Sequence, residues 1–181
     1  MNKKNLKPGL LWITGLSGSG KTIISKIIFK KLKKKYSNIV LLDGDILRKK
    51  LKIKNKGTFT NTHRTKVGLQ YVKLCRKIIK NEKKFVIIAV MALLRKVEIE
   101  YKKIRNYKDV YLNVPISELK RRDPKGLYKK FKEKKINNMA GLDIKFYKPN
   151  KPSITINWNK KMTANAISKK ILKVVDQKNL I

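Results

Sequence analysis

The stretch GLSGSGKT at residues 15–22 has the spacing of a phosphate-binding loop. Its glycines allow successive backbone N–H groups to turn toward phosphate oxygens, and a helix that follows adds its positive N-terminal end. A lysine ammonium neutralises charge on the β- and γ-phosphates, and a threonine hydroxyl can bind Mg²⁺. The stretch therefore predicts a site for ATP or GTP with magnesium, against the alternative of a purely structural glycine turn. The residues expected at the nucleotide are Gly15, Leu16, Ser17, Gly18, Ser19, Gly20, Lys21 and Thr22, with Thr22 as the Mg²⁺ ligand.

Two carboxylates follow the next apolar run, in LLDGDILR. Parallel α/β sheets bind ligands at the carboxyl ends of their strands, so Asp43 and Asp45 are expected beside the phosphate loop. Either could orient Mg²⁺ through water or accept the proton of an attacking hydroxyl. The alternative is that Asp45 only caps the next helix. Arg48, one turn later, suggests a second anion in the same cleft.

The elements that must position these residues alternate between apolar runs and amphipathic stretches, which is typical of βαβ units in a parallel sheet. We expect strands at Leu10–Thr14, Ile39–Asp43, Phe85–Met91, Val110–Val114 and Ser153–Asn157. Helices are expected at Thr22–Tyr36, Asp45–Leu51, Arg64–Lys80, Lys96–Asn106, Pro115–Arg122 and Thr163–Asp176, the last capped by Thr163.

Two polar, turn-rich segments, 52–63 and 123–152, interrupt this pattern. Long loops inside a compact domain are usually functional. With 181 residues and 41% hydrophobic content, the chain is expected to form one domain over residues 1–181.

The formal net charge of +37 would attract polyanions such as nucleic acid. The lysines are spread along the whole chain, however, and zinc-finger or RNP-type motifs are missing, so a nucleotide-dependent nucleic-acid-binding protein is only the remote alternative. The longest apolar runs are too short for a membrane span. The single cysteine, Cys75, has helical spacing with Leu74 and Ile78, which favours a buried thiol in a cytoplasmic protein.

Five stretches in this order, GLSGSGKT, LLDGDILR, VYLNVP, RDPKGLYKK and GLD, resemble the adenylyl-sulfate kinase (APS kinase) family of P-loop kinases. The resemblance covers about residues 9–157, and RDPKGLYKK is its most specific part. It implies a P-loop kinase fold with a five-stranded parallel sheet flanked by helices on both faces. The implied reaction moves the γ-phosphoryl group of ATP to the ribose 3′-hydroxyl of a nucleoside 5′-phosphate anhydride.

The resemblance also implies roles for individual residues. Asp45 aligns with the family's catalytic base, and Lys21 is expected to act with it on the phosphoryl group. Arg122 and the residues after it would form a basic lid, within a lid region of about 121–152. The expected acceptor site comprises Asp43, Asp45, Arg48, Phe59, Arg64, Lys125, Leu127, Asn138 and Met139. A homodimer is expected because dimers are common in the family.

The sequence departs from the family on the acceptor side. Met139 stands where the family has a second aromatic that sandwiches adenine, Val67 replaces an asparagine, and Ala92 replaces a serine. Such changes alter which base fits. Some members near this family, associated with capsular polysaccharide modification, phosphorylate cytidine diphosphoramidate. The substitutions narrowly favour this acceptor, with adenylyl sulfate as the alternative.

Overall fold

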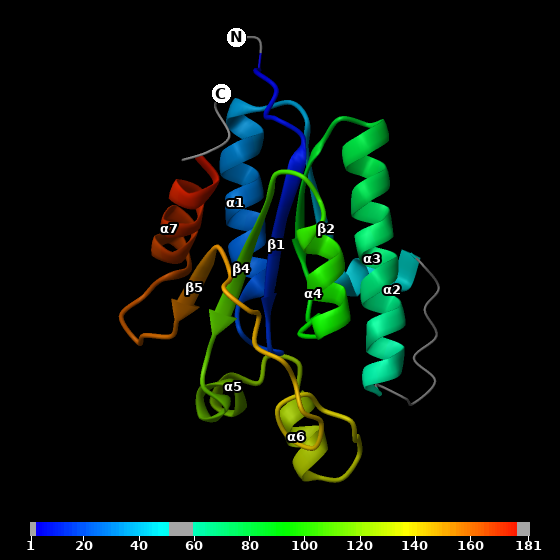
Figure 1. The fold of residues 1–181 in the computed structure, drawn as a ribbon. Coiled ribbons are helices and arrows are strands. Elements are labelled where there is room, and N and C mark those ends of the chain that lie inside the picture. The colour runs from blue at the N-terminus through cyan, green and yellow to red at the C-terminus, as the bar shows by residue number, and fades with distance from the viewer. Residues whose placement is uncertain (1–2, 51–59, 177–181) are drawn as a thin grey trace.

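The computed structural model describes residues 3–50 and 60–176. Within them, five parallel strands form one sheet in the order β2-β3-β1-β4-β5 (Figure 1). The strands are β1 (Gly9–Gly15), β2 (Ile39–Asp43), β3 (Phe85–Ala89), β4 (Tyr107–Asn113) and β5 (Ile154–Asn157). The predicted five-stranded parallel sheet is confirmed.

Helices cover both faces of the sheet, and two short helices lie beyond the carboxyl ends of its strands (Figure 1). One face is covered by α1 (Lys21–Lys35) and α7 (Ala164–Asp176), and the other by α3 (Asn61–Asn81) and α4 (Arg95–Lys102). The remaining helices are α2 (Gly44–Lys50), α5 (Ile116–Arg122) and α6 (Leu127–Lys132).

The central strand β1 has the sequence GLLWITG and is buried along its whole length. Successive side chains of a strand point to opposite faces, so a strand covered on both sides is apolar throughout. Leu11 and Ile13 join the core cluster beneath α1 and α7, whereas Leu10 and Trp12 join the cluster beneath α3 and α4. The Trp12 ring stacks on Tyr101 of α4, with ring centroids 4.7 Å apart.

A third apolar cluster lies at the carboxyl ends of the strands and joins the phosphate loop to the lid. Leu16 of the loop packs with Leu119 of α5 and Tyr128 of α6. The other buried members of the cluster are Leu93, Tyr111, Met139 and Ala140. This cluster gives the lid region a core of its own.

Most predicted elements are confirmed to within three residues at each end, and Thr163 caps α7 because its hydroxyl accepts from Ala166 N at 3.2 Å. The helix α3 begins at Asn61, before the predicted Arg64, because the Thr60 hydroxyl caps it through His63 N. Predicted helix 96–106 ends at Lys102, and Asn106 adopts a positive φ of 60° in the turn into β4. The prediction did not include α6.

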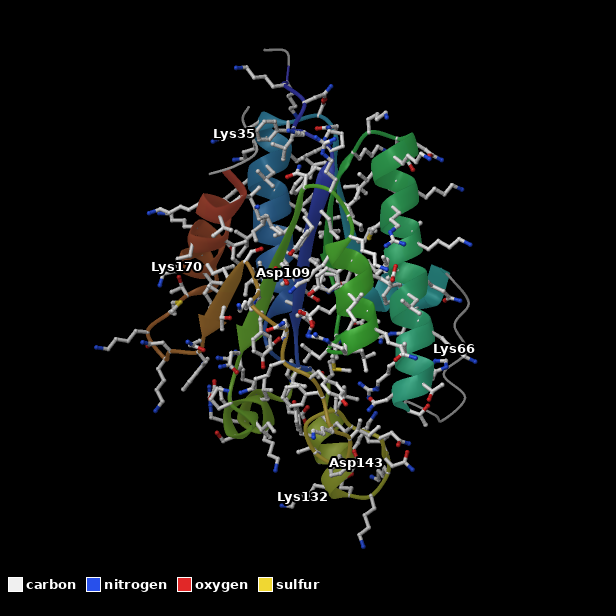
Figure 2. All side chains as sticks on the ribbon, viewed as in Figure 1. Lys35, Lys66, Asp109, Lys132, Asp143 and Lys170 are labelled. Atoms are coloured by element: carbon white, nitrogen blue, oxygen red, sulfur yellow. The ribbon has the colours of Figure 1, made fainter. Side chains whose placement is uncertain are left out.

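Lysine side chains project from every layer of the fold, as Lys35 in α1, Lys66 in α3, Lys132 in α6 and Lys170 in α7 show (Figure 2). This spread agrees with the even distribution of lysine along the sequence. Of the helices in the described ranges, none has the length and apolar character that a membrane span requires.

Candidate active site

The glycine loop connects β1 directly to α1. Gly20 is the N-cap of α1 and has a φ of 90°, a left-handed conformation that glycine adopts without a steric penalty. The Lys21 ammonium folds back onto the loop, where it donates to Gly15 O at 2.9 Å and Leu16 O at 2.7 Å. Burial, together with the positive charge of Lys125, lowers the pKa of Lys21 to about 7. Phosphate oxygens would therefore stabilise the charged form of this lysine.

Asp43 joins the phosphate loop to the end of β2. Its Oδ2 accepts from the Thr22 hydroxyl at 2.9 Å, and its Oδ1 accepts from Asp45 N at 2.9 Å. The second contact places Asp43 at the start of α2, which is the position of a helix cap. The alternative in which Asp45 caps this helix is therefore wrong, because Asp45 lies one step inside the first turn.

Asp45 lies between two cations. One of its carboxylate oxygens contacts Arg48 in the same helix, and the other contacts Lys125 in the lid. Burial alone would raise the pKa of Asp45, but hydrogen bonds from Lys125 and Arg48 outweigh it and hold that pKa below its usual value. The side chain is 45% exposed, so a substrate hydroxyl could reach it. Asp45 is therefore an ionised carboxylate on the open side of the loop.

The lid contacts the phosphate loop through Tyr128. Its hydroxyl donates to Ser17 O at 3.2 Å, while its ring packs with Leu16. The Asp123 carboxylate accepts from the backbone N–H groups of Tyr128 and Lys129 at 3.1 and 2.9 Å, so it fixes the start of α6. The loop and the lid therefore form one connected unit.

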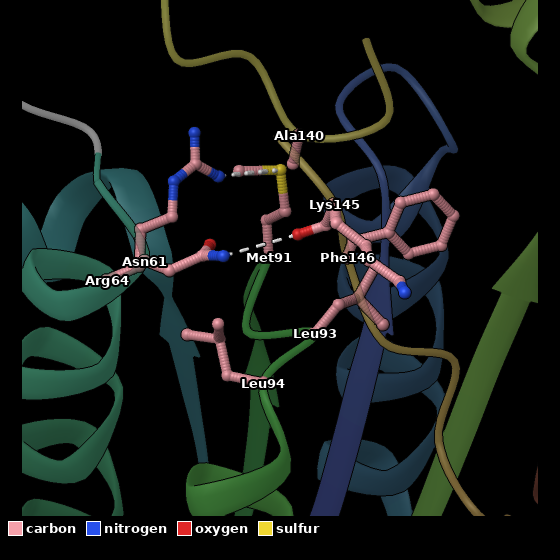
Figure 3. Close-up of a pocket in the computed structure, with 8 residues that line it drawn as sticks. All are labelled: Asn61, Arg64, Met91, Leu93, Leu94, Ala140, Lys145 and Phe146. Atoms are coloured by element: carbon pink, nitrogen blue, oxygen red, sulfur yellow. Dashed lines mark hydrogen bonds between the residues drawn. The ribbon is translucent and has the colours of Figure 1, made fainter. Parts of the chain in front are cut away.

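On the side where the acceptor is expected, α3 faces the segment that follows α6. The Arg64 guanidinium donates to Asn138 O at 2.6 Å and lies beside the Met91 sulfur (Figure 3). Burial lowers the pKa of Arg64, and the positive charge of Arg48 lowers it further. Below the guanidinium is a small pocket, lined by Asn61, Arg64, Met91, Leu93, Leu94, Ala140, Lys145 and Phe146 (Figure 3).

The structure brings Asp43, Asp45, Arg48 and Lys125 together beside the loop, and it brings Arg64 to Asn138. Three other residues, expected at ATP or at the acceptor, instead contact residues of α5 or of the third apolar cluster. Arg122 donates to Glu118 Oε1 at 2.6 Å within α5, Leu127 packs against the lid cluster, and Met139 is buried in that cluster with 8% exposure. Their roles at ATP or acceptor stay predictions. Phe59 lies outside the described residues.

The family departures are found in packed positions. Ala92 is buried beneath α3 and α4, and Val67 packs against the same cluster. The apolar side chains of Val67 and Ala92 therefore belong to the core beneath α3 and α4.

Sequence reasoning missed two residues that organise the site, Tyr128 and Asp143. Both lie inside the motifs that carry the resemblance, RDPKGLYKK and GLD. Their place in these motifs was the sequence signal that could have indicated a role at the site. Tyr128 contacts the phosphate loop, and Asp143 accepts from the backbone of Asn138 and Met139.

Comparison with known proteins places this arrangement in one family. The model of the family described as adenylylsulphate kinase matches residues 7–157. The chain belongs to the adenylylsulphate kinase family. It is thus a phosphotransferase of an ATP-using kinase family.

Two curated relatives carry different names. The cytidine diphosphoramidate kinase of Campylobacter jejuni is 36% identical over 143 residues, which cover 78% of this chain and 82% of that protein. The adenylyl-sulfate kinase of Pseudomonas aeruginosa is 35% identical over 156 residues, which cover 84% of this chain and 78% of that protein. The chain is therefore about equally similar in sequence to these two relatives.

The fold also matches a solved member of the family. The Mycobacterium tuberculosis APS kinase CysC, in complex with AMPPNP and APS, superposes with a TM-score of 0.81 over 96% of this chain and 99% of that one, at 23% identity. At this identity the match shows the fold, and it confirms the predicted P-loop kinase architecture.

Proposed function

We propose that the protein transfers the γ-phosphoryl group of ATP to the ribose 3′-hydroxyl of a nucleoside 5′-phosphate anhydride. The observation that carries this proposal is the chain of contacts from Thr22 through Asp43 to the backbone of Asp45. It sets the half-exposed Asp45 carboxylate beside the loop that would hold the triphosphate. A hydroxyl bound at Asp45 would then face the terminal phosphorus.

Each residue has a role in this reaction. Lys21 would leave the carbonyls of Gly15 and Leu16 for the phosphate oxygens and stabilise the charge on the transferring group. Asp45 would orient the acceptor hydroxyl and take its proton. Tyr128 would keep the lid on the loop and limit the access of water.

The residues at the loop fit a magnesium ion. The Thr22 hydroxyl and an Asp43 oxygen lie 2.9 Å apart, and Mg²⁺ prefers such oxygen ligands together with waters and phosphate oxygens. Thr22 would bind the ion directly and Asp43 would act through water. The ion would supply positive charge that stabilises the phosphate oxygens.

For the acceptor we propose cytidine diphosphoramidate, with adenylyl sulfate as the second candidate. The relative from Campylobacter jejuni supports the first and the relative from Pseudomonas aeruginosa the second. Met139 favours the smaller base, because this residue provides no ring that could stack on adenine at the position of the family's second aromatic. Homodimer formation and a cytoplasmic location stay predictions.

The test measures ADP and 3′-phosphorylated product for the purified protein with ATP, Mg²⁺ and each acceptor. We expect 3′-phosphorylated product from both acceptors, with a higher kcat/KM for cytidine diphosphoramidate. Product formation should require the 3′-hydroxyl of the acceptor. The 3′-deoxy form of each acceptor is the control and should yield no product. If neither acceptor raises ADP formation above background, the proposed function is wrong. A higher kcat/KM for adenylyl sulfate would leave the kinase in place and reverse the acceptor preference.

A further inference from the structure

The turn at residues 138–141 forms one wall of the acceptor side, and a carboxylate holds it. Asp143 Oδ2 accepts from Asn138 N at 2.7 Å, and Asp143 Oδ1 accepts from Met139 N at 2.5 Å. Asn138 has a φ of 58°, a conformation that residues other than glycine rarely adopt. Two backbone N–H groups held by one carboxylate stabilise this unusual conformation.

The segment 138–145, which begins with this turn, contacts α3 at one residue before Asp143 and at one residue after it. Before it, Asn138 O accepts from Arg64 at 2.6 Å, and after it, Lys145 O accepts from Asn61 Nδ2 at 3.4 Å (Figure 3). Asp143 itself lies in the segment after α6, near the surface (Figure 2). Because Asp143 lies between Asn138 and Lys145 in the sequence, its hydrogen bonds help to fix the backbone that makes both contacts with α3.

Arg64 needs this support because it lies near a like charge. Burial and then the positive charge of Arg48 lower the pKa of the Arg64 guanidinium, and the negative charge of Asp143 opposes both effects. The Asp143 side chain is exposed, so water screens its charge. The contribution of Asp143 is therefore mainly geometric, through the backbone that presents Asn138 O to Arg64.

We infer that Asp143 is a positioning residue of the acceptor site, which holds the 138–141 turn so that Asn138 O fixes Arg64 for the acceptor's anionic group. This inference rests on the proposed function, because it is the acceptor that Arg64 is proposed to bind. Asp143 touches neither substrate in this account and acts only through the turn.

The lid offers a matched control. Asp123 also accepts from two consecutive backbone N–H groups, those of Tyr128 and Lys129, but it fixes the start of α6, whose Tyr128 contacts the phosphate loop. Loss of Asp123 should therefore affect the ATP side, whereas loss of Asp143 should affect the acceptor side. A general loosening of the lid would affect both substrates equally in both variants.

The experiment measures KM for each substrate and kcat in Asp143→Ala, Asp143→Asn and Asp123→Ala, after circular dichroism has confirmed that each variant is folded. We expect Asp143→Ala to raise the acceptor KM about tenfold, because small misplacements of a binding group are costly, and to leave the ATP KM within about threefold. Asp143→Asn keeps only one of the two oxygen acceptors, so its acceptor KM should lie between those of the original protein and Asp143→Ala. Asp123→Ala should raise the ATP KM more than the acceptor KM.

Two results would overturn the inference. One is an equal rise of both KM values in Asp143→Ala, and the other is an acceptor KM of Asp143→Ala within about threefold of the original value, which would show that the turn does not need the carboxylate. Calorimetric titration with cytidine diphosphate provides a readout that does not need turnover. If the original protein phosphorylates neither acceptor, the proposed function is wrong. The inference about Asp143 is rejected separately if Asp143→Ala and the original protein bind cytidine diphosphate with equal affinity.

Discussion

The Lys125 ammonium in the lid contacts the Asp45 carboxylate at the start of α2, and Arg48 contacts the other oxygen of the same carboxylate. Asp45 thus contacts both cations. An acceptor with a 5′-phosphate anhydride would compete with Asp45 for them, because phosphate oxygens form the same charge-assisted contacts. Binding of the acceptor would then release Asp45 to take the hydroxyl proton.

Replacing Lys125 by methionine should weaken acceptor binding. The variant loses one cation for the acceptor's anion, so we expect the acceptor KM to rise about tenfold, the effect of losing roughly one charge-assisted hydrogen bond, while the ATP KM changes less than threefold. Steady-state kinetics with each substrate varied measures both values. Lys132→Met, at an exposed position of α6, is the control and should behave as the original protein. Equal effects of the two substitutions would argue against a specific role of Lys125.

Replacing Lys21 should slow the chemical step. Removal of a cation that stabilises the transition state typically costs about 10²–10³-fold in kcat, and we expect this for Lys21→Met. Lys21→Arg should not restore the rate, because a planar guanidinium cannot take the place of a compact ammonium that contacts Gly15 O and Leu16 O. An arginine variant with nearly full kcat would contradict this role.

A third prediction concerns the packing of α3 against α4. A Cβ added at Gly68 would lie 2.6 Å from Val97 Cγ2, and Val97 is fully buried. We expect Gly68→Ala to lower the free energy of unfolding by about 1–3 kcal/mol, which chemical denaturation measures. In the double variant with Val97→Ala, the combined loss should be smaller than the sum of the two single losses, since the clash is removed. Additive losses would mean that the two positions do not interact.

The buried thiol gives a fourth prediction. Burial raises the pKa of Cys75 to about 12, so the thiol stays protonated at neutral pH and its reactive thiolate is scarce until the pH approaches that value. A thiol reagent at pH 8 should therefore modify the folded protein far more slowly than the protein in denaturant. Equal rates in the two states would show that Cys75 is accessible.

The local signals in the sequence predicted the parts of the fold that depend on neighbouring residues. The strand, glycine loop and helix around Lys21 follow from apolar runs, glycines and helical spacing, and β2 was predicted with its exact bounds. The sequence also placed Asp43 and Asp45 beside the loop. The sequence did not show that Asp43 caps α2 through Asp45 N, or that its other oxygen accepts from Thr22, which lies 21 positions away.

The lid could not be predicted in the same way. The helix α6 has only six residues, and it depends on the Asp123 carboxylate at its start and on Tyr128 packing against Leu16. The contact of Arg64 with Asn138 joins residues 74 positions apart. Such contacts depend on the tertiary arrangement, so the motif residues could be named but not their partners.

The most direct test of the account is a rapid-quench measurement of a single turnover with saturating ATP, Mg²⁺ and acceptor in the original protein and in Asp45→Asn. If the Asp45 carboxylate takes the hydroxyl proton beside the phosphate loop, Asp45→Asn should form 3′-phosphorylated product at least about 100-fold more slowly, as expected for loss of a general base, with an unchanged Kd for ATP. A single-turnover rate within threefold of the original protein would contradict the central role of Asp45.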